Sequence, residues 1–322
     1  MSNYTLRPAQ RGNAKPLVGL YGESGAGKTW SALLLARGFV GPAGKIAMIE
    51  TEAGRGEVYA GVAPVGDYLV RSLGEPFSPE RYGEAISDCE KAKVDALIID
   101  SGSHEWEAVG CVLDMAAANE EKGWKGQIVW TRPKLSHSRH FVLRFAQTPI
   151  PLVILCLRSK FPLEEVVNDK GKKDLKRTTI PVPIQSDTFI NEMLIHGWID
   201  REHRIHVTKY PLAIPELRGV VPDLQPITTE TGARLAVWAS GTTTESAGRP
   251  SSQASAPSPD EGAPADLYLS PDDQLAISDE CRKLGTGALE ALLKRAGVAS
   301  IALMPADKLD SCRMWIETKR QA

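Results

Sequence analysis

The sequence predicts an α/β fold with a mostly parallel central sheet, followed by a flexible linker and a small helical module. Short apolar runs alternate with amphipathic stretches over the first two thirds of the chain, as in sheets covered by helices on both faces. The first apolar run, Pro16–Tyr21, leads into a glycine-rich turn that opens a helix. Gly241–Asp266 is dominated by Ser, Thr, Ala, Pro and Gly, so it cannot bury enough apolar surface to fold.

The composition predicts one large domain and a smaller one. The 322 residues are 42% hydrophobic and 24% charged, which is ordinary for a globular protein of this length. We therefore divide the chain into an N-terminal extension (1–15), the α/β domain (16–240), a disordered linker (241–266) and a helical module (267–322).

Hydrophobic periodicity, glycines and prolines define the elements of the large domain. The expected strands and helices, in chain order, are strand Pro16–Tyr21, helix Lys28–Phe39, strands Lys45–Ile49 and Tyr68–Ser72, helix Pro79–Lys91 capped by Ser78, strand Val94–Asp100, helices His104–Asn119 and Pro133–Gln147, and strand Leu152–Leu157. After these, Phe161–Ile184 is expected to form a β-hairpin or mobile loop that turns near Asp169–Gly171. Two late strands are expected at Thr188–Ile195 and Arg204–Lys209.

Charge, cysteines and hydropathy narrow the class of protein. The net charge is -2, so contact with nucleic acid would need a local basic patch. The five cysteines are scattered without metal-ligand spacing, which is typical of reduced thiols in the cytosol. The first 15 residues are polar and no apolar run approaches ~18 residues, so we expect neither a signal peptide nor a membrane span. A cytoplasmic location follows.

A phosphate-binding loop (P-loop) follows the first predicted strand. Gly22-Glu23-Ser24-Gly25-Ala26-Gly27-Lys28-Thr29 fits the pattern G-x-x-x-x-G-K-[ST] between a strand and a helix. Its glycines let backbone N–H groups surround phosphate oxygens at the positive end of the helix. Lys28 is expected to reach the β- and γ-phosphates, and the Thr29 hydroxyl to ligate Mg²⁺. We add Trp30, the next residue, to the expected nucleotide-binding set, with ATP as the nucleotide.

Two carboxylates follow buried strands further along the chain. Asp100 ends the apolar run Val94–Asp100, a position from which it can act on Mg²⁺ as a second metal-binding residue. Glu50-Thr51-Glu52 ends the strand that begins at Lys45. Hydrolysis needs a carboxylate that orients and deprotonates the attacking water, and we assign this role to Glu52, with Lys28 as its catalytic partner. A solvated loop glutamate is the alternative for Glu52.

In this order, the P-loop, Ile49–Glu52, Leu97–Ser101 and Leu152–Lys160 resemble the core of RecA-type ATPases. They are more closely similar to the compact RecA-like ATPases that phages encode beside single-strand annealing proteins. The segment Trp130–Lys134, which precedes a helix, also matches the pattern of those phage proteins. The resemblance implies a RecA-like P-loop NTPase core that binds and hydrolyses ATP with Mg²⁺. It places Glu52 at the position of the catalytic glutamate.

The resemblance also implies partners for the chain. RecA proteins carry lysines on a late strand that reach the nucleotide of the neighbouring subunit, and Lys209 in His206–Pro211 is the candidate here. A homo-oligomer, single-stranded DNA and a phage annealing or single-strand-binding protein are therefore expected partners, in the cytoplasm of the host cell. The chain departs from RecA at the end of the strand Leu152–Leu157, because Leu157-Arg158 stands where RecA has a glutamine that senses the γ-phosphate.

Basic residues suggest where DNA would bind. They gather in the segment after the last apolar strand, where RecA-like proteins place DNA-binding loops, and on the helix that begins at Pro133. The residues are Lys160, Lys170, Lys172, Lys173, Lys176 and Arg177 in the segment, and Lys134, Arg139 and Arg144 on the helix. A solvated hairpin is the alternative, because acidic residues interleave with these lysines.

The last segment has helical periodicity. Ser270-Pro271 is typical of a helix start, and apolar residues recur at helical spacing as far as Ile316. It resembles a helical module at the C-termini of several phage recombination proteins, and a generic docking domain is the alternative.

Two other functions share the same P-loop. A nucleotide or small-molecule kinase would need a basic lid over the phosphates, and Lys170–Arg177 is the candidate for one. In a nucleotide-gated assembly protein, ATP would organise a complex and hydrolysis would be incidental.

Overall fold

The structure is a computed structural model, and the chain forms two compact units, Met1–Arg249 and Pro250–Ala322. The described residues of the first unit are 14–167, 173–211, 213–214 and 216–241. Those of the second are 273, 276–277, 280–281, 284, 288–296 and 308–320. The predicted turn at Asp169–Gly171, residues 1–13 of the predicted N-terminal extension and residues 242–266 of the predicted linker lie outside them.

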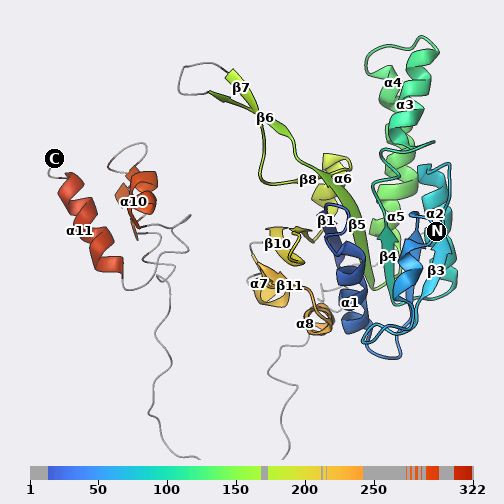
Figure 1. The fold of residues 1–322 in the computed structure, drawn as a ribbon, viewed down its shortest axis with the longest axis horizontal. Helices are drawn as coiled ribbons and strands as arrows, with labels where there is room; N and C mark the ends of the chain where they lie inside the picture. The colour runs from blue at the N-terminus through green and yellow to red at the C-terminus, as the bar shows by residue number, and fades with distance from the viewer. Residues whose placement is uncertain are drawn as a thin grey trace, which may run out of the picture. The chain divides into compact units, whose positions relative to one another are not determined.

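The first unit is an α/β structure with a mostly parallel central sheet, as the sequence predicts (Figure 1). The strands run in the order β11-β10-β9-β1-β5-β4-β2-β3, with β8 paired to β5 off this path. All pairs from β9 to β3 are parallel, whereas β10, β11 and β8 pair antiparallel. The strands are β1 (Leu17–Gly22), β2 (Ile46–Glu50), β3 (Leu69–Ser72), β4 (Ala96–Asp100), β5 (Leu152–Lys160), β8 (Val182–Pro183), β9 (Ile195–Ile199), β10 (Arg204–Lys209) and β11 (Gln225–Pro226).

The parallel register brings polar strand ends into one row. Gly22 at the end of β1 lies opposite Arg158 of β5. On the other side of β5, Asp100 of β4 lies opposite Cys156, and Glu50 of β2 lies opposite Asp100. Because parallel strands end at the same edge of a sheet, segments far apart in the sequence meet there.

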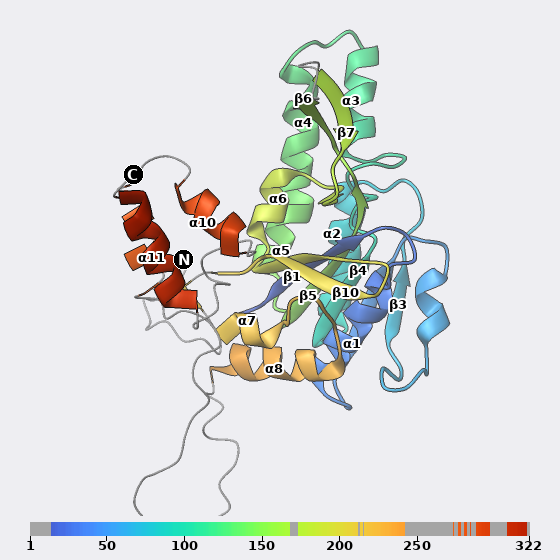
Figure 2. The same cartoon turned by 60° about the vertical axis from the view of Figure 1, so that its left-hand side comes forward.

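Helices cover both faces of the sheet, and each face has its own hydrophobic core (Figure 2). Helices α1 (Lys28–Val40), α7 (Glu216–Val220) and α8 (Thr229–Ser240) pack on one face, with Leu33, Leu35 and Leu235 fully buried. Helix α2 (Pro79–Lys91), α5 (Leu143–Gln147) and α6 (Asp187–Glu192) pack on the other. Apolar residues along each strand point alternately into the two cores. The same alternation determines toward which face of the sheet the polar residue at each strand end points.

Glycines set the close packing of α1 on α8. A Cβ atom on Gly232 of α8 would collide with the backbone of α1 at Leu35 and Phe39, and one on Gly38 would collide with the backbone of Thr229. Only a residue without a side chain allows the two helix backbones to approach this closely.

Gly232→Ala is therefore expected to lower the free energy of unfolding by about 1–3 kcal/mol, because backbone atoms must move to admit the methyl group. Urea denaturation measures the change. Gly219→Ala is the matched control, because a Cβ atom at Gly219 of α7 meets nothing within 4 Å. Equal stability of the two variants would contradict the packing argument.

Helix α4 (Ile128–Ser136) begins five residues earlier than the sequence predicts, so Pro133 lies inside it. It continues through a π-helical turn, η3 (His137–Val142), into α5. Proline has no N–H for the carbonyl of Val129, and the Asn119 side chain donates to that carbonyl instead, at 2.8 Å. The Asn119 side chain thus satisfies the carbonyl that Pro133 leaves without a partner. The helix can therefore continue through a proline that the sequence pattern indicated as a helix start.

Two other predicted elements were wrong. The predicted helix His104–Asn119 is a series of turns as far as Cys111, and helix α3 spans only Val112–Glu121. The predicted strand Thr188–Ile195 is instead helix α6, which Ser186 caps by accepting a hydrogen bond from the Phe189 N–H. Burial of Phe189 in the core outweighs the β-propensity of the neighbouring residues.

The predicted hairpin is confirmed in its described part. Strands β6 (Leu163–Val167) and β7 (Lys173–Arg177) pair antiparallel. Figures 1 and 2 show this hairpin and the α3–α4 pair extending away from the sheet.

In the second unit, helices α10 (Ala288–Ala296) and α11 (Leu309–Arg320) bury a small core around Ile277, Leu292 and Ile316. No described helix in either unit is long and apolar enough to cross a membrane.

Candidate functional site

The P-loop connects β1 to the start of α1, as predicted. Gly25 and Gly27 have φ of 84° and 92°, a left-handed backbone that glycine adopts without strain. These turns bring the start of α1 under the loop. Lys28 Nζ donates to the carbonyls of Gly22 (3.0 Å) and Glu23 (2.8 Å), which holds the ammonium group at the loop.

Asp100 and Thr29 meet although 71 residues separate them. The Thr29 hydroxyl donates to Asp100 Oδ2 at 2.5 Å. Asp100 has the same strand parity as Ile98, whose side chain packs in the α1 core, so its carboxylate faces the start of α1. Burial raises the pKa of the Asp100 carboxyl, against the Thr29 hydrogen bond and the Lys28 charge. A neighbouring cation would stabilise this buried carboxylate.

These two residues fit a Mg²⁺ site of the kind that phosphates complete. Mg²⁺ prefers oxygen ligands and is often bound through one or two protein groups, with water and substrate phosphates completing the octahedron. A hydroxyl and a carboxylate in contact beside a P-loop provide that donor set. Among the described residues no group of three or more His, Cys, Asp or Glu forms a cage for a metal.

A cavity of about 1160 Å³ opens above the P-loop. Most expected nucleotide-binding residues line it, together with Glu52 and Asp100: Gly22, Glu23, Ser24, Gly25, Gly27, Lys28, Thr29 and Trp30. Ala26 is the exception, because it is buried and its carbonyl accepts a hydrogen bond from His203 Nδ1 at 2.9 Å.

The two glutamates after β2 have different environments. Glu50 is buried, and its carboxylate accepts hydrogen bonds from the backbone N–H groups of Glu52 (2.7 Å) and Gly54 (3.0 Å). Glu50 therefore shapes the turn and orients the backbone of Glu52. Glu52 itself lines the cavity, which supports its choice as the residue that faces the attacking water.

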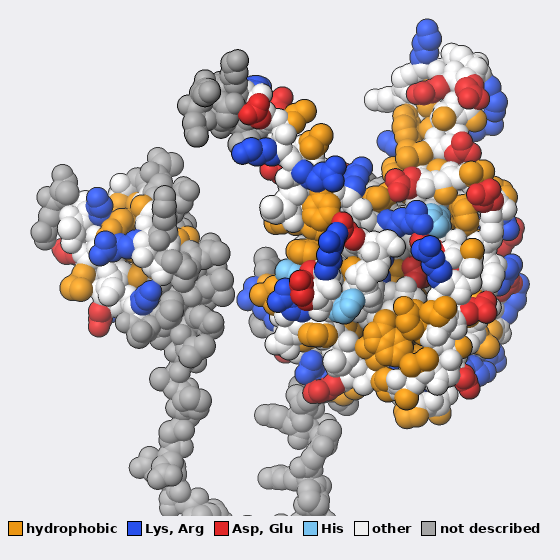
Figure 3. Space-filling view, viewed as in Figure 1, with side chains coloured by type: hydrophobic (Ala, Val, Ile, Leu, Met, Phe, Trp, Pro, Cys, Tyr) orange, Lys and Arg blue, Asp and Glu red, His pale blue; other side chains and the backbone are white. Residues whose placement is uncertain are grey.

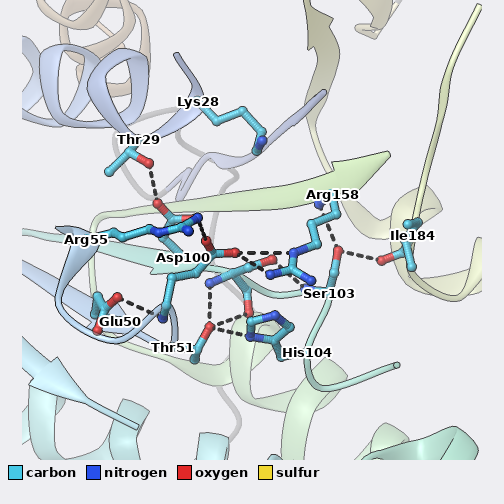
Figure 4. A network of polar contacts seen from close by, with 12 residues as sticks. Lys28, Thr29, Glu50, Thr51, Arg55, Asp100, Ser103, His104, Arg158 and Ile184 are labelled. Carbon is cyan, nitrogen blue, oxygen red and sulfur yellow. Dashed lines mark hydrogen bonds and ion pairs between the residues drawn. The ribbon is translucent and has the colours of Figure 1, made fainter. Parts of the chain in front are cut away.

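Two arginines bind the Glu52 carboxylate, and no motif in the sequence predicts either contact. Arg158 donates to Oε1 from Nη2 (2.8 Å) and Nε (3.2 Å), and Arg55 donates to Oε2 at 3.2 Å. Figure 4 shows Arg55 and Arg158 in this network of polar contacts. Burial raises the pKa of Glu52, but the hydrogen bond and charge of Arg158, together with the charges of His104 and Arg55, outweigh it and leave the pKa lowered.

The Thr51 side chain ties the ends of β2 and β4 together. Its hydroxyl accepts from the Ser101 N–H at 2.8 Å and contacts His104 Nδ1 at 2.8 Å. Both contacts are buried, so they fix the strand end that carries Asp100 next to the turn that carries Glu52. Thr51 and His104 are support residues that only the fold reveals.

Aromatic and aliphatic side chains also line the cavity. Trp30 and Tyr59 lie with ring centroids 5.4 Å apart, and Leu34, Val62 and Ile227 line the same region. Tyr59 ends the 3-10 helix η2 (Arg55–Tyr59) after β2. An apolar wall in the cavity that the P-loop lines suits a flat heterocycle such as a nucleotide base.

Lys209 lies away from this cavity. It pairs with His196 at the start of β9, and His196 pairs with Gly19, in the half of β1 far from the P-loop. Its amine donates to the carbonyl of Asn191 at 2.5 Å. Lys209 therefore does not reach the nucleotide site of its own chain, and its predicted role in a neighbouring copy stays a prediction about an assembly.

Neither a protein-family model nor a curated protein matches this sequence.

Proposed function

We propose that this chain binds a nucleoside triphosphate, ATP, together with Mg²⁺ and hydrolyses it, in the manner of RecA-like P-loop ATPases. The observation that carries the proposal is the contact between Thr29 and Asp100 beside the Lys28 ammonium group, at the base of a large cavity. A lysine, a hydroxyl and a carboxylate at a glycine-rich helix start are the groups that a magnesium triphosphate requires.

Each group has a distinct task in this proposal. P-loop N–H groups and Lys28 bind the phosphates, and Thr29 and Asp100 would hold Mg²⁺. When bound, Mg²⁺ neutralises charge on the β- and γ-phosphates. Glu52 faces the cavity and orients the attacking water. Trp30 and Tyr59 hold the base.

We further propose that the protein acts on single-stranded DNA in phage recombination or replication, with an annealing or single-strand-binding protein as partner. The β6–β7 hairpin supports DNA contact, because Lys173, Lys176 and Arg177 lie on it beside exposed Leu163 and Leu175 (Figure 3). Cations neutralise backbone phosphates, and apolar groups pack on unstacked bases.

Hydrolysis is favoured over phosphoryl transfer to a second substrate. The candidate lid of a kinase, Lys170–Arg177, is described from Lys173 onward, and this part pairs with β6 and does not line the cavity. A carboxylate does line the cavity, at Glu52, which suits activation of water.

The test is ATP turnover by the purified protein. Phosphate release is expected in Mg²⁺ buffer and is expected to stop with EDTA. Single-stranded DNA is expected to change the rate at about 50 mM salt and to have less effect at about 200 mM, because salt weakens phosphate contacts.

Three outcomes separate the alternatives. Absence of Mg²⁺-dependent turnover would contradict the ATPase. If DNA neither binds nor changes the rate at low salt, only the DNA part fails. Phosphate transfer to a nucleoside or nucleotide with little hydrolysis would identify a kinase.

A further inference from the structure

Arg158 has a fixed backbone and a half-exposed side chain that contacts Glu52. Its N–H donates to Ser103 Oγ at 2.9 Å, and its carbonyl accepts from the Ile184 N–H at 2.8 Å. Ser103 Oγ in turn donates to the Ile184 carbonyl at 2.7 Å. The Arg158 side chain is 47% exposed, and its guanidinium donates two hydrogen bonds to Glu52 Oε1. A long cationic side chain thus extends from a rigid anchor.

The strand register places this side chain on the face of the sheet that carries α1, beside the strand that leads into the P-loop. Cys156 packs in the core on the α1 face and Leu157 in the core on the opposite face, so Arg158 points to the α1 face by alternation. Its backbone lies opposite Gly22, whose carbonyl binds the Lys28 ammonium group. Neighbouring strands lie about 4.8 Å apart, a distance that an arginine side chain spans.

The ion pair between Arg158 and Glu52 can be exchanged for a contact between Arg158 and a phosphate group. Both side chains line the cavity, and a partly exposed ion pair is weak. A triphosphate beside Lys28 offers more negative charge than one carboxylate, and a guanidinium binds phosphate oxygens with two parallel hydrogen bonds.

We propose that Arg158 is a catalytic arginine that leaves Glu52 for the γ-phosphate of the nucleotide bound in the same chain. This inference rests on the proposed ATPase function. The exchange brings a positive charge to the γ-phosphate and frees Glu52 Oε1, while Arg55 continues to hold Oε2. Triphosphate binding thereby releases the group that activates water.

The chemical step that follows is hydrolysis. The water oxygen bonds to the γ-phosphorus as the bond from that phosphorus to the β–γ bridging oxygen breaks. The bridging oxygen keeps the electron pair and leaves as part of ADP. Glu52 accepts the water proton and later releases it to solvent. Arg158 stabilises the charge on the γ-phosphate oxygens during this step.

The test compares Arg158→Ala and Arg158→Lys with the parent protein. We expect Arg158→Ala to lower kcat about 10³-fold, the low end of the range for such arginines. ADP affinity is expected to stay within about threefold, whereas affinity for ADP with aluminium fluoride falls by on the order of 10²-fold, since that complex resembles the transition state. Arg158→Lys is expected to recover part of the rate because it keeps the charge but not the planar fork.

Arg71→Ala is the matched control, because Arg71 is also an exposed strand arginine in an ion pair, with Asp88 at 3.2 Å. Its kcat is expected to be unchanged. Circular dichroism melting checks that the fold of each variant is intact.

Other results would overturn the inference. An unchanged or increased kcat in Arg158→Ala would show that Arg158 only restrains Glu52. An equal loss of affinity for ADP and for the aluminium fluoride complex would show that it only supports the pocket. If the parent protein hydrolyses ATP, these results reject Arg158 and leave the proposed function standing. A parent protein that neither binds nor hydrolyses ATP rejects both.

Discussion

Lys28→Ala is expected to weaken triphosphate binding by on the order of 10²-fold and to abolish measurable turnover. The Lys28 ammonium group is held at the carbonyls of Gly22 and Glu23, where the β- and γ-phosphates would lie. Charge-assisted hydrogen bonds to a cation contribute about 1.5–3 kcal/mol each, and about 1.4 kcal/mol corresponds to tenfold in affinity. Isothermal titration calorimetry with a non-hydrolysable ATP analogue measures the loss.

The control is Lys45→Ala. Lys45 is exposed and precedes β2 at the opposite edge of the sheet, so its removal lowers the net charge equally without touching the cavity. Identical binding by Lys28→Ala and the parent protein would show that the P-loop does not grip a triphosphate. The ATPase proposal would then fail.

Glu52→Gln is expected to lower kcat about 10²- to 10⁴-fold while ATP binding is retained. Glutamine keeps the shape of the side chain but cannot accept the proton of the attacking water. The side chain lines the cavity beside the P-loop, whereas the backbone turn depends on the carboxylate of Glu50. Single-turnover kinetics with a separate measurement of ATP affinity distinguish a chemical defect from a binding defect.

Glu57→Gln is the control for this substitution, because Glu57 is an exposed glutamate in η2, five residues further along. A parent-like rate in Glu52→Gln would remove Glu52 from the mechanism. A loss of ATP affinity as large as the loss of rate would instead make it a binding residue.

Features that depend on neighbouring residues were predicted more accurately than features that depend on packing between segments. The start of α1 at Lys28 and of α2 at Pro79 were predicted correctly, because glycine or a Ser-Pro pair marks a helix start within a few residues. The start of helix α4 was predicted five residues too late, and helix α6 was predicted as a strand. The first depends on the bond from Asn119 to the Val129 carbonyl and the second on the burial of Phe189 in the core, and residue spacing within one segment shows neither contact.

The candidate site likewise has one part that a local sequence pattern predicts and one part that only the fold creates. The loop from Gly22 to Thr29 has a backbone geometry that consecutive residues specify, so its pattern could be recognised directly in the sequence. The bond from Arg158 to Glu52 had no such signal, because it requires β5 and β2 to end at the same edge with β4 between them.

By itself, the sequence determined the α/β class, the phosphate-binding turn and the buried strand that ends in Asp100, because each depends on residue spacing within one segment. The tertiary structure decided which carboxylate faces the cavity, which one supports the turn, and where Arg158 points. It also placed Lys209 far from the P-loop of its own chain. Strand order and side-chain partners arise from packing between remote segments, and no local pattern encodes them.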